Sequence, residues 1–141
     1  MKKLNEFKEL SLDVVKVMAK AAEEKALEIN VPVVIAAVDK GANLMLMHRM
    51  EDAFVTSIDI AINKAFTSAC LRQGSHEITD AIQPGASLYG LQLTNNARIV
   101  PFGGGLPVVV DGVVVGAIGV SGGTVNEDML IAQAAVDAFY K

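Results

Sequence analysis

The chain has 141 residues, of which 52% are hydrophobic and 5% aromatic, and its formal net charge is -4. This length suits one domain with its own core, so we expect residues 1–141 to form a single domain. No run of lysine or arginine exceeds two residues, which disfavours binding to nucleic acid or to an anionic membrane. Cys70 is the only cysteine, so no internal disulfide can form, and we expect a cytoplasmic protein.

The first half of the chain predicts a helix followed by two strands. Ser11 caps an apolar stripe at helical spacing that continues to about Asn30. The β-branched run 31–39 predicts a buried strand, and 44–50 predicts its returning partner after a turn at 40–43. Strand alternation places Leu44, Leu46, His48 and Met50 on one face of the returning strand, and Met45, Met47 and Arg49 on the other.

The middle of the chain predicts helices. An apolar stripe indicates a helix over 54–72, and Ser75 can cap a shorter helix that reaches Ile82. Pro84-Gly85 ends this second helix. Residues 86–97 fit either a loop or a short helix.

The last third predicts strands and a final helix. We expect strands at 98–102, 106–110 and 113–120. Asp111-Gly112 between β-branched runs predicts a tight hairpin, and Thr124 with Glu127 forms a capping box. Two hairpins with helices before, between and after them indicate an α+β fold, in which helices cover a central antiparallel sheet.

Two glycine-rich segments are candidate ligand sites. Gly103, Gly104 and Gly105 can expose amides to an anion, although a tight entry into the next strand is the favoured interpretation. Ser121 lies in a glycine-rich turn before the capped helix, where anions can also bind. The phosphate-loop, dinucleotide-binding and zinc signatures are missing, and no catalytic constellation surrounds Ser121.

The remaining candidates are basic side chains. His48 and His76 can each ligate iron or another metal, and the alternative for both is a structural histidine. Lys64 lies in an apolar helix, where it either reaches water, pairs with an acid or points into a ligand pocket. Arg49, at the end of a strand, can join an ion-pair cluster or meet an anionic ligand.

Several motifs together resemble one family. They are Val38-Asp39-Lys40-Gly41, Arg49-Met50-Glu51-Asp52-Ala53, Lys64-Ala65, Gly103-Gly104-Gly105-Leu106-Pro107, Gly116-Ala117-Ile118-Gly119-Val120-Ser121-Gly122-Gly123 and Asp128. In this order, over nearly the whole chain, they resemble the GlcG/HbpS family, which includes the C-terminal domain of PduO-type proteins and is often labelled haem-degrading. The likeness is greatest to the OrfY-type members associated with glycerol or diol dehydratase operons.

The resemblance implies a profilin-like fold, a homo-oligomer and, for some members, haem binding or a link to cobalamin-dependent diol metabolism. Some haem-binding members use a histidine on the first helix, and 11–30 contains none. The adenosyltransferase domain of PduO-type proteins is also missing, so no cobalamin adenosylation is inferred.

Three functions remain open from the sequence. The leading hypothesis is a protein that binds a small molecule, with haem as the candidate, through Arg49, Lys64, Ser121 and the amides of 103–105. The second is a structural or interaction module that binds no ligand and serves a glycerol or diol pathway, with a dehydratase as partner. The third is an enzyme, haem-degrading or isomerase-like, which the residues support least.

Overall fold

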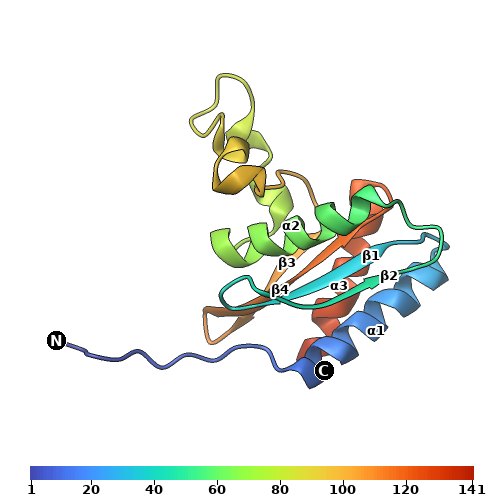
Figure 1. Cartoon of the computed structure of the whole chain (residues 1–141), viewed down its shortest axis with the longest axis horizontal. Helices are drawn as coiled ribbons and strands as arrows, with labels where there is room; N and C mark the ends of the chain where they lie inside the picture. The colour runs from blue at the N-terminus through green and yellow to red at the C-terminus, as the bar shows by residue number, and fades with distance from the viewer.

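The computed structural model describes residues 1–141 and contains a four-stranded antiparallel sheet in the order β2-β1-β4-β3 (Figure 1). The strands are Val34–Asp39 (β1), Leu44–Arg49 (β2), Gly105–Val110 (β3) and Val113–Ser121 (β4). The long helices are Leu12–Glu28 (α1), Thr56–Leu71 (α2) and Val125–Tyr140 (α3). Short 3-10 helices occupy Ser75–Ile78 (η1), Asp80–Ile82 (η2), Leu91–Leu93 (η3) and Asn95–Ala97 (η4). The predicted α+β class is confirmed.

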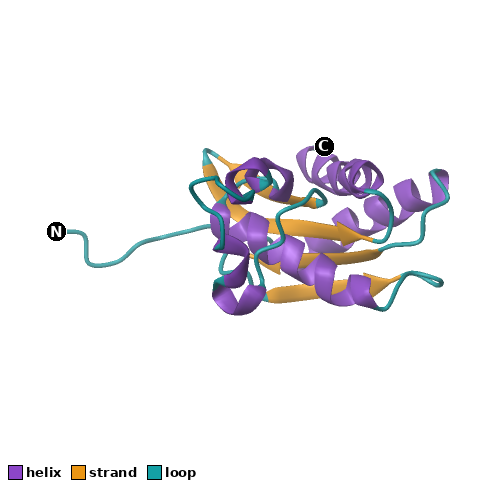
Figure 2. Ribbon diagram, turned by 90° about the horizontal axis from the view of Figure 1, so that it is seen from above, coloured by secondary structure: helices purple, strands orange, loops and turns teal.

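The helices cover the two faces of the sheet unequally (Figures 1 and 2). α1 and α3 pack against each other on one face and enclose a cluster of 17 buried residues. α2 alone packs on the other face, where the cluster of 8 buried residues consists of six alanines and two valines. The helical layer on the α2 side of the sheet is therefore thinner than the layer formed by α1 and α3.

β1 begins later than the sequence predicts. The amide of Val31 donates to the carbonyl of Ala26, which closes the C-terminal end of α1, and Pro32 has no amide to give to a sheet. α1 accordingly ends at Glu28 rather than Asn30, and β1 starts at Val34 rather than Val31.

An irregularity in the β1–β2 pairing changes the face on which Met45 lies. The register shifts between Ala37 and Val38, so that one extra residue is inserted in β2. Met45 then packs against the larger cluster beside α1 and α3, whereas Met47 packs against the cluster beneath α2. The prediction that Met45 and Met47 share a face was wrong, because a bulge reverses the alternation beyond it.

The predicted strand at 98–102 is absent, and the predicted helix at 75–82 is two 3-10 turns. The amide of Val100 donates to Thr67 Oγ1, and the carbonyl of Phe102 accepts from Ser75 Oγ. These backbone groups are satisfied by side chains of α2 and η1, so they form no ladder with a neighbouring strand.

From Gly105 onward the structure agrees with prediction. Asp111 and Gly112 both have positive φ, as a two-residue hairpin requires. Thr124 and Glu127 cap α3 reciprocally, through bonds of 2.8 Å and 3.2 Å. No helix in the structure combines the length and the apolar character needed to cross a bilayer.

Candidate functional site

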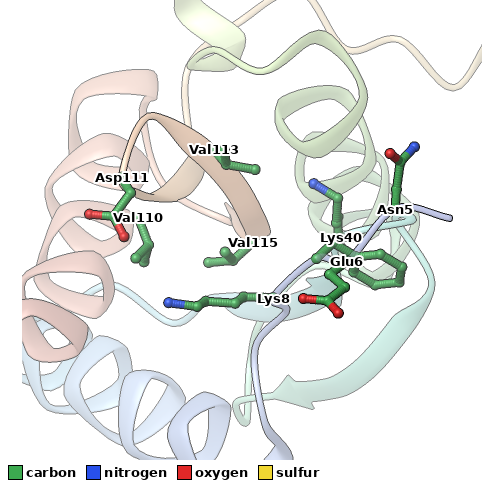
Figure 3. Close-up of a pocket in the computed structure, with 9 residues that line it drawn as sticks. Asn5, Glu6, Lys8, Lys40, Val110, Asp111, Val113 and Val115 are labelled. Atoms are coloured by element: carbon green, nitrogen blue, oxygen red, sulfur yellow. The ribbon is translucent and has the colours of Figure 1, made fainter. Parts of the chain in front are cut away.

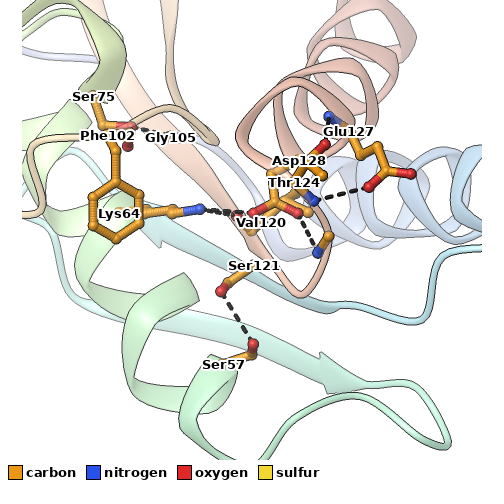
Figure 4. A network of polar contacts seen from close by, with 11 residues as sticks. Ser57, Lys64, Ser75, Phe102, Gly105, Val120, Ser121, Thr124, Glu127 and Asp128 are labelled. Carbon is orange, nitrogen blue, oxygen red and sulfur yellow. Dashed lines mark hydrogen bonds and ion pairs between the residues drawn. The ribbon is translucent and has the colours of Figure 1, made fainter.

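The structure separates the predicted site residues into an interior group and a surface group. Lys64, Ser121 and 103–105 gather where α2 crosses the ends of β3 and β4 (Figure 4). His48 and Arg49 lie at the exposed end of β2. His76 lies apart from both groups, exposed on η1. The two groups are therefore two different sites.

Lys64 forms a buried ion pair with Asp128. Its Nζ donates to Asp128 Oδ2 at 2.9 Å and to the carbonyl of Val120 at 2.9 Å, and its side chain is 1% exposed (Figure 4). The other carboxylate oxygen of Asp128 accepts from the amide of Gly123 at 2.8 Å. The ring of Phe102 lies 5.1 Å from Nζ and covers it. The pair joins α2, β4 and α3 at one point.

Burial governs the ionisation of both partners. It lowers the pKa of Lys64, and the Asp128 carboxylate offsets that effect only in part. Burial also raises the pKa of Asp128, against the opposing influence of Lys64 and the amides of Gly123 and Gly122. Removal of one partner would leave the other as an uncompensated charge in the interior.

The glycines around the pair permit close approach of α2 to the sheet. A Cβ on Gly104 would lie 2.7 Å from Lys64 Nζ, and one on Gly105 would overlap the carbonyl of Lys64. Gly119, opposite Gly105 in the sheet, would meet the carbonyl of Ala61 in the same way. The amide of Gly105 already donates to Ser75 Oγ at 2.9 Å. In this structure, then, the glycines serve packing, and the amide of Gly105 is occupied.

Hydroxyl groups complete the interior group. Ser121 is buried, and its Oγ lies 3.1 Å from Ser57 Oγ (Figure 4). Ser68 Oγ is buried with no hydrogen-bond partner, close to the position that a Cβ on Gly105 would occupy. No nucleophile–base pair arises here, because neither histidine belongs to this group.

The surface group lines a groove between α1 and β2, which we call the α1–β2 groove. It has a volume of about 470 Å³ and is lined by Glu23, Leu27, Met47, His48, Arg49, Met50 and Glu51. The volume falls in the range of small-molecule sites. The groove brings a histidine, a cationic side chain and two thioethers to one place.

Glu23 determines which nitrogen of His48 is available. His48 Nδ1 contacts Glu23 Oε1, so a neutral His48 that donates from Nδ1 leaves Nε2 free as a ligand. A carboxylate that orients a histidine through its second nitrogen is the usual arrangement around protein-bound metals. The His48 side chain is 47% exposed, so a ligand can reach it from solvent.

A cavity larger than the α1–β2 groove contains none of the predicted residues. It measures about 660 Å³ and lies between the N-terminal segment 5–8, Lys40 and the tip of the β3–β4 hairpin (Figure 3). Residues 1–9 are all exposed and extend away from the body (Figure 1). One wall of this cavity is therefore a segment with few contacts to the body, whereas the α1–β2 groove lies between two packed elements.

The sequence did not predict the roles of two residues at these sites. Glu23 reads as part of the polar face of a helix, and only the contact between α1 and β2 brings it to His48. Asp128 belongs to a recognised motif, but its partner lies 64 positions earlier in the chain, and no local spacing indicates that pairing. No cluster of three or more histidine, cysteine, aspartate or glutamate side chains is arranged to hold a metal.

The comparisons with known proteins define the class of protein to which this fold corresponds. A family model described as haem degrading protein HbpS-like matches residues 10–137, so the chain belongs to the HbpS-like family.

Three individual proteins make the likeness more specific. The chain is 64% identical over 139 residues to an uncharacterised 15.0 kDa protein in the dhaT-dhaS intergenic region of Citrobacter freundii, covering 99% of this chain and 98% of that one. It is 55% identical to the crystal structure of the protein ORFY of Klebsiella pneumoniae, with a TM-score of 0.98 over 99% of this chain and 97% of the other. It is 40% identical to a PduOC structure in complex with haem, with a TM-score of 0.89 over 92% of this chain and 94% of the other. The resemblance stated from the motifs is confirmed.

Proposed function

We propose that this protein binds haem, or a similar large planar ligand with carboxylates, in the α1–β2 groove. The observation that carries the proposal is that His48, Arg49, Met47 and Met50 line one groove. Support comes from a relative of the same fold, 40% identical, whose structure is described as a complex with haem.

The donor set of the groove fits a haem. A neutral imidazole is a common axial ligand of haem iron, and the contact with Glu23 leaves Nε2 of His48 for that role. Arg49 supplies a cation for a propionate, and Met47 and Met50 supply soft apolar walls. Bound haem would supply redox and ligand-binding chemistry at its iron, while the protein residues hold and orient it.

The interior group receives a different role in this proposal. Lys64 and 103–105 were also predicted to meet ligand carboxylates, but Lys64 already has two acceptors and is buried. Ser121 is likewise buried and bonded to Ser57. We therefore assign these residues to holding α2, β4 and α3 together, and the surface group to the ligand.

A haemin titration tests the proposal. Wild-type protein should give a saturable shift of the Soret band, and His48→Ala should weaken binding by roughly 100-fold, since even outer-shell partners of metal ligands cost about 10–100-fold. His76→Ala is the matched control, because His76 is the other exposed histidine and lies outside the groove. Equal affinity in wild type and His48→Ala would exclude His48 as the ligand, and no saturable shift in wild type would exclude haem.

A second candidate function is an accessory role in glycerol or diol metabolism. The observation in its favour is the location of the 64% identical relative between dhaT and dhaS. Capture of a glycerol or diol dehydratase subunit by the tagged chain, with no small molecule retained, would support this role. Capture of the same subunit by an unrelated tagged protein would count against it.

A further inference from the structure

Two cavities adjoin at the end of the sheet where the β3–β4 hairpin turns. The larger is the cavity of about 660 Å³ between the N-terminal segment 5–8 and the hairpin, which we call the apolar compartment (Figure 3). The smaller, of about 360 Å³, lies between the hairpin tip, residues 40–41 and the C-terminal end of α2, and we call it the cationic compartment. Lys40 and Val113 line both, so the two compartments meet at these side chains.

Valines of the hairpin form the floor of the apolar compartment. Val110, Val113 and Val115 project from β3 and β4 into the space that Phe7 of the N-terminal segment also lines (Figure 3). Val113 and Phe7 are 47% and 63% exposed, so apolar surface is left uncovered here. An apolar group bound between the hairpin and Phe7 would remove this surface from water, and the volume suits a small molecule.

The cationic compartment has two cations and no acid among its lining residues. Lys40 follows β1, Arg72 ends α2, and Cys70 lies on the same wall as Arg72. Neither cation forms an ion pair within the chain. Lys40 Nζ donates one hydrogen bond, to the carbonyl of Val114 at 3.2 Å, so two of its three donors remain for a ligand.

The acids nearby do not balance these two cations. Asp39 ends β1, but its Oδ1 accepts from two backbone amides of the turn at 40–43, at 2.9 Å each. Glu6 and Asp111 line only the apolar compartment, where Lys8 also lies. An anionic group is therefore attracted to the cationic compartment, whereas in the apolar compartment it would meet two carboxylates.

The N-terminal segment is placed to close over a ligand in the apolar compartment. The amide of Leu10 donates to the carbonyl of Val115 at 2.9 Å, and the Leu10 side chain is 4% exposed, so the segment is fixed to the body at this residue. Further towards the N-terminus, the ring centroid of Phe7 lies 5.8 Å from Lys40 Nζ. A movement of segment 5–8 about Leu10 would bring Phe7 onto an apolar group bound over the hairpin.

We infer that the two compartments together bind a small free amphiphile, a molecule with an apolar chain and a carboxylate at one end. The carboxylate lies between Lys40 and Arg72, and the chain lies over the valines of the hairpin, beneath Phe7. Charge complementarity orients the ligand, because only the cationic compartment offers unpaired cations without an acid. Neither compartment shares a lining residue with the α1–β2 groove, so the inference does not depend on haem binding.

The test uses decanoate, a straight-chain carboxylate, below the concentration at which it forms micelles. Isothermal titration calorimetry of the wild type should show saturable binding. Lys40→Met combined with Arg72→Met should weaken that binding by about tenfold, because two solvent-accessible ion pairs with the carboxylate are lost. Lys16→Met combined with Lys20→Met is the matched control, since it removes two exposed charges on α1 and should leave the affinity unchanged.

Three further measurements distinguish a lost ligand contact from a damaged fold. Decanol has the same chain without the charge, so it should bind the wild type and the Lys40–Arg72 double variant equally. Cys70, the only cysteine, lines the cationic compartment, so saturating decanoate should slow its alkylation by iodoacetamide in the wild type. Decanoate should also slow tryptic cleavage after Lys8, because the segment closes over the ligand.

Four results would overturn the inference. Absence of saturable decanoate binding in the wild type removes the ligand, also if vesicles of anionic phospholipid bind instead. Equal decanoate affinity in the wild type and the Lys40–Arg72 double variant places the carboxylate elsewhere. Weaker decanol binding in that variant shows that the two cations act through the fold. Unchanged alkylation of Cys70 at saturating decanoate leaves the cationic compartment empty.

Discussion

Two regions of this protein hold the charged residues that the sequence offers as ligand contacts, and their environments are opposite. Lys64 and Asp128 are 1% and 4% exposed; Lys64 Nζ donates to two acceptors of the chain, and both carboxylate oxygens of Asp128 accept hydrogen bonds from it. His48 and Arg49 lie in a groove open to solvent, where only one nitrogen of His48 has a partner. A basic residue in a recognised motif therefore does not by itself identify a ligand site. The number of its donors that remain free is the better criterion.

The largest expected effect follows from removal of one partner of the buried pair. Lys64→Met should lower the free energy of unfolding by about 3–5 kcal/mol, because it leaves the Asp128 carboxylate buried without a counter-charge. Lys64→Met combined with Asp128→Leu should recover much of that loss, since neither charge remains. Urea denaturation measures both values.

The control for the buried pair is an exposed one. Lys20 lies 3.9 Å from Glu24 on α1, with both side chains mostly exposed, so Lys20→Met should change the unfolding free energy by less than about 1 kcal/mol. Equal losses in Lys64→Met and Lys20→Met would contradict the structural role of the interior pair.

Close packing of α2 predicts the next effect. Gly119→Ala adds a Cβ that overlaps the carbonyl of Ala61, so it should lower the unfolding free energy by about 1–3 kcal/mol or more. Gly41→Ala is the matched control, because its Cβ would meet only the side chains of Asn43 and Asp39 in a surface turn. If thermal unfolding shows the same midpoint for Gly119→Ala and wild type, the carbonyl of Ala61 on α2 does not lie in contact with Gly119 on β4.

The carboxylate of Glu23, which contacts His48 in the groove, should affect haemin affinity and leave the free energy of unfolding unchanged. Glu23→Gln leaves His48 Nδ1 a weaker partner, and haemin affinity should fall by about tenfold. The unfolding free energy should stay within about 0.5 kcal/mol of wild type, as for most surface substitutions. A haemin titration beside urea denaturation separates the two effects, and a tenfold loss of affinity that accompanies unfolding would refute the assignment.

The smallest expected effect belongs to Arg49. Arg49→Ala should weaken haemin binding by about threefold, because an exposed ion pair contributes at most about 1 kcal/mol. Haemin dimethyl ester, which lacks the propionate charges, should bind wild type and Arg49→Ala equally well. Unequal binding of the ester would show that Arg49 acts through something other than a carboxylate.

The sequence predicted the three long helices, two hairpins and the cap of α3, since each depends on local patterns such as Thr124 with Glu127. It missed features that depend on contacts between distant segments. The bulge that turns Met45 to the other face shows only in the pairing of β1 with β2. The segment 98–102 has β-branched residues but forms no strand, because Thr67 and Ser75 take its backbone groups.

The same distinction holds for the candidate sites. His48 and Arg49 were identified by residue type, and the structure puts them in one groove, while Glu23 needed the packing of α1 on β2. The sequence left three alternatives for the Lys64 side chain, one of which was pairing with an acid, and the structure identifies Asp128 as that acid. The favoured interpretation of 103–105 as a tight entry into a strand agrees with β3 beginning at Gly105.

Haem binding in the α1–β2 groove is tested most directly by a map of the ligand-binding site on the protein. Gallium protoporphyrin is a diamagnetic substitute for haem, and its titration into isotope-labelled protein reports every backbone amide by NMR. Haem binding in the α1–β2 groove predicts that shifts concentrate at residues 20–27 of α1 and 46–51 around the end of β2. Shifts concentrated at 102–105 and 121–128, with the groove unchanged, would contradict it and would place the ligand at the Lys64–Asp128 pair.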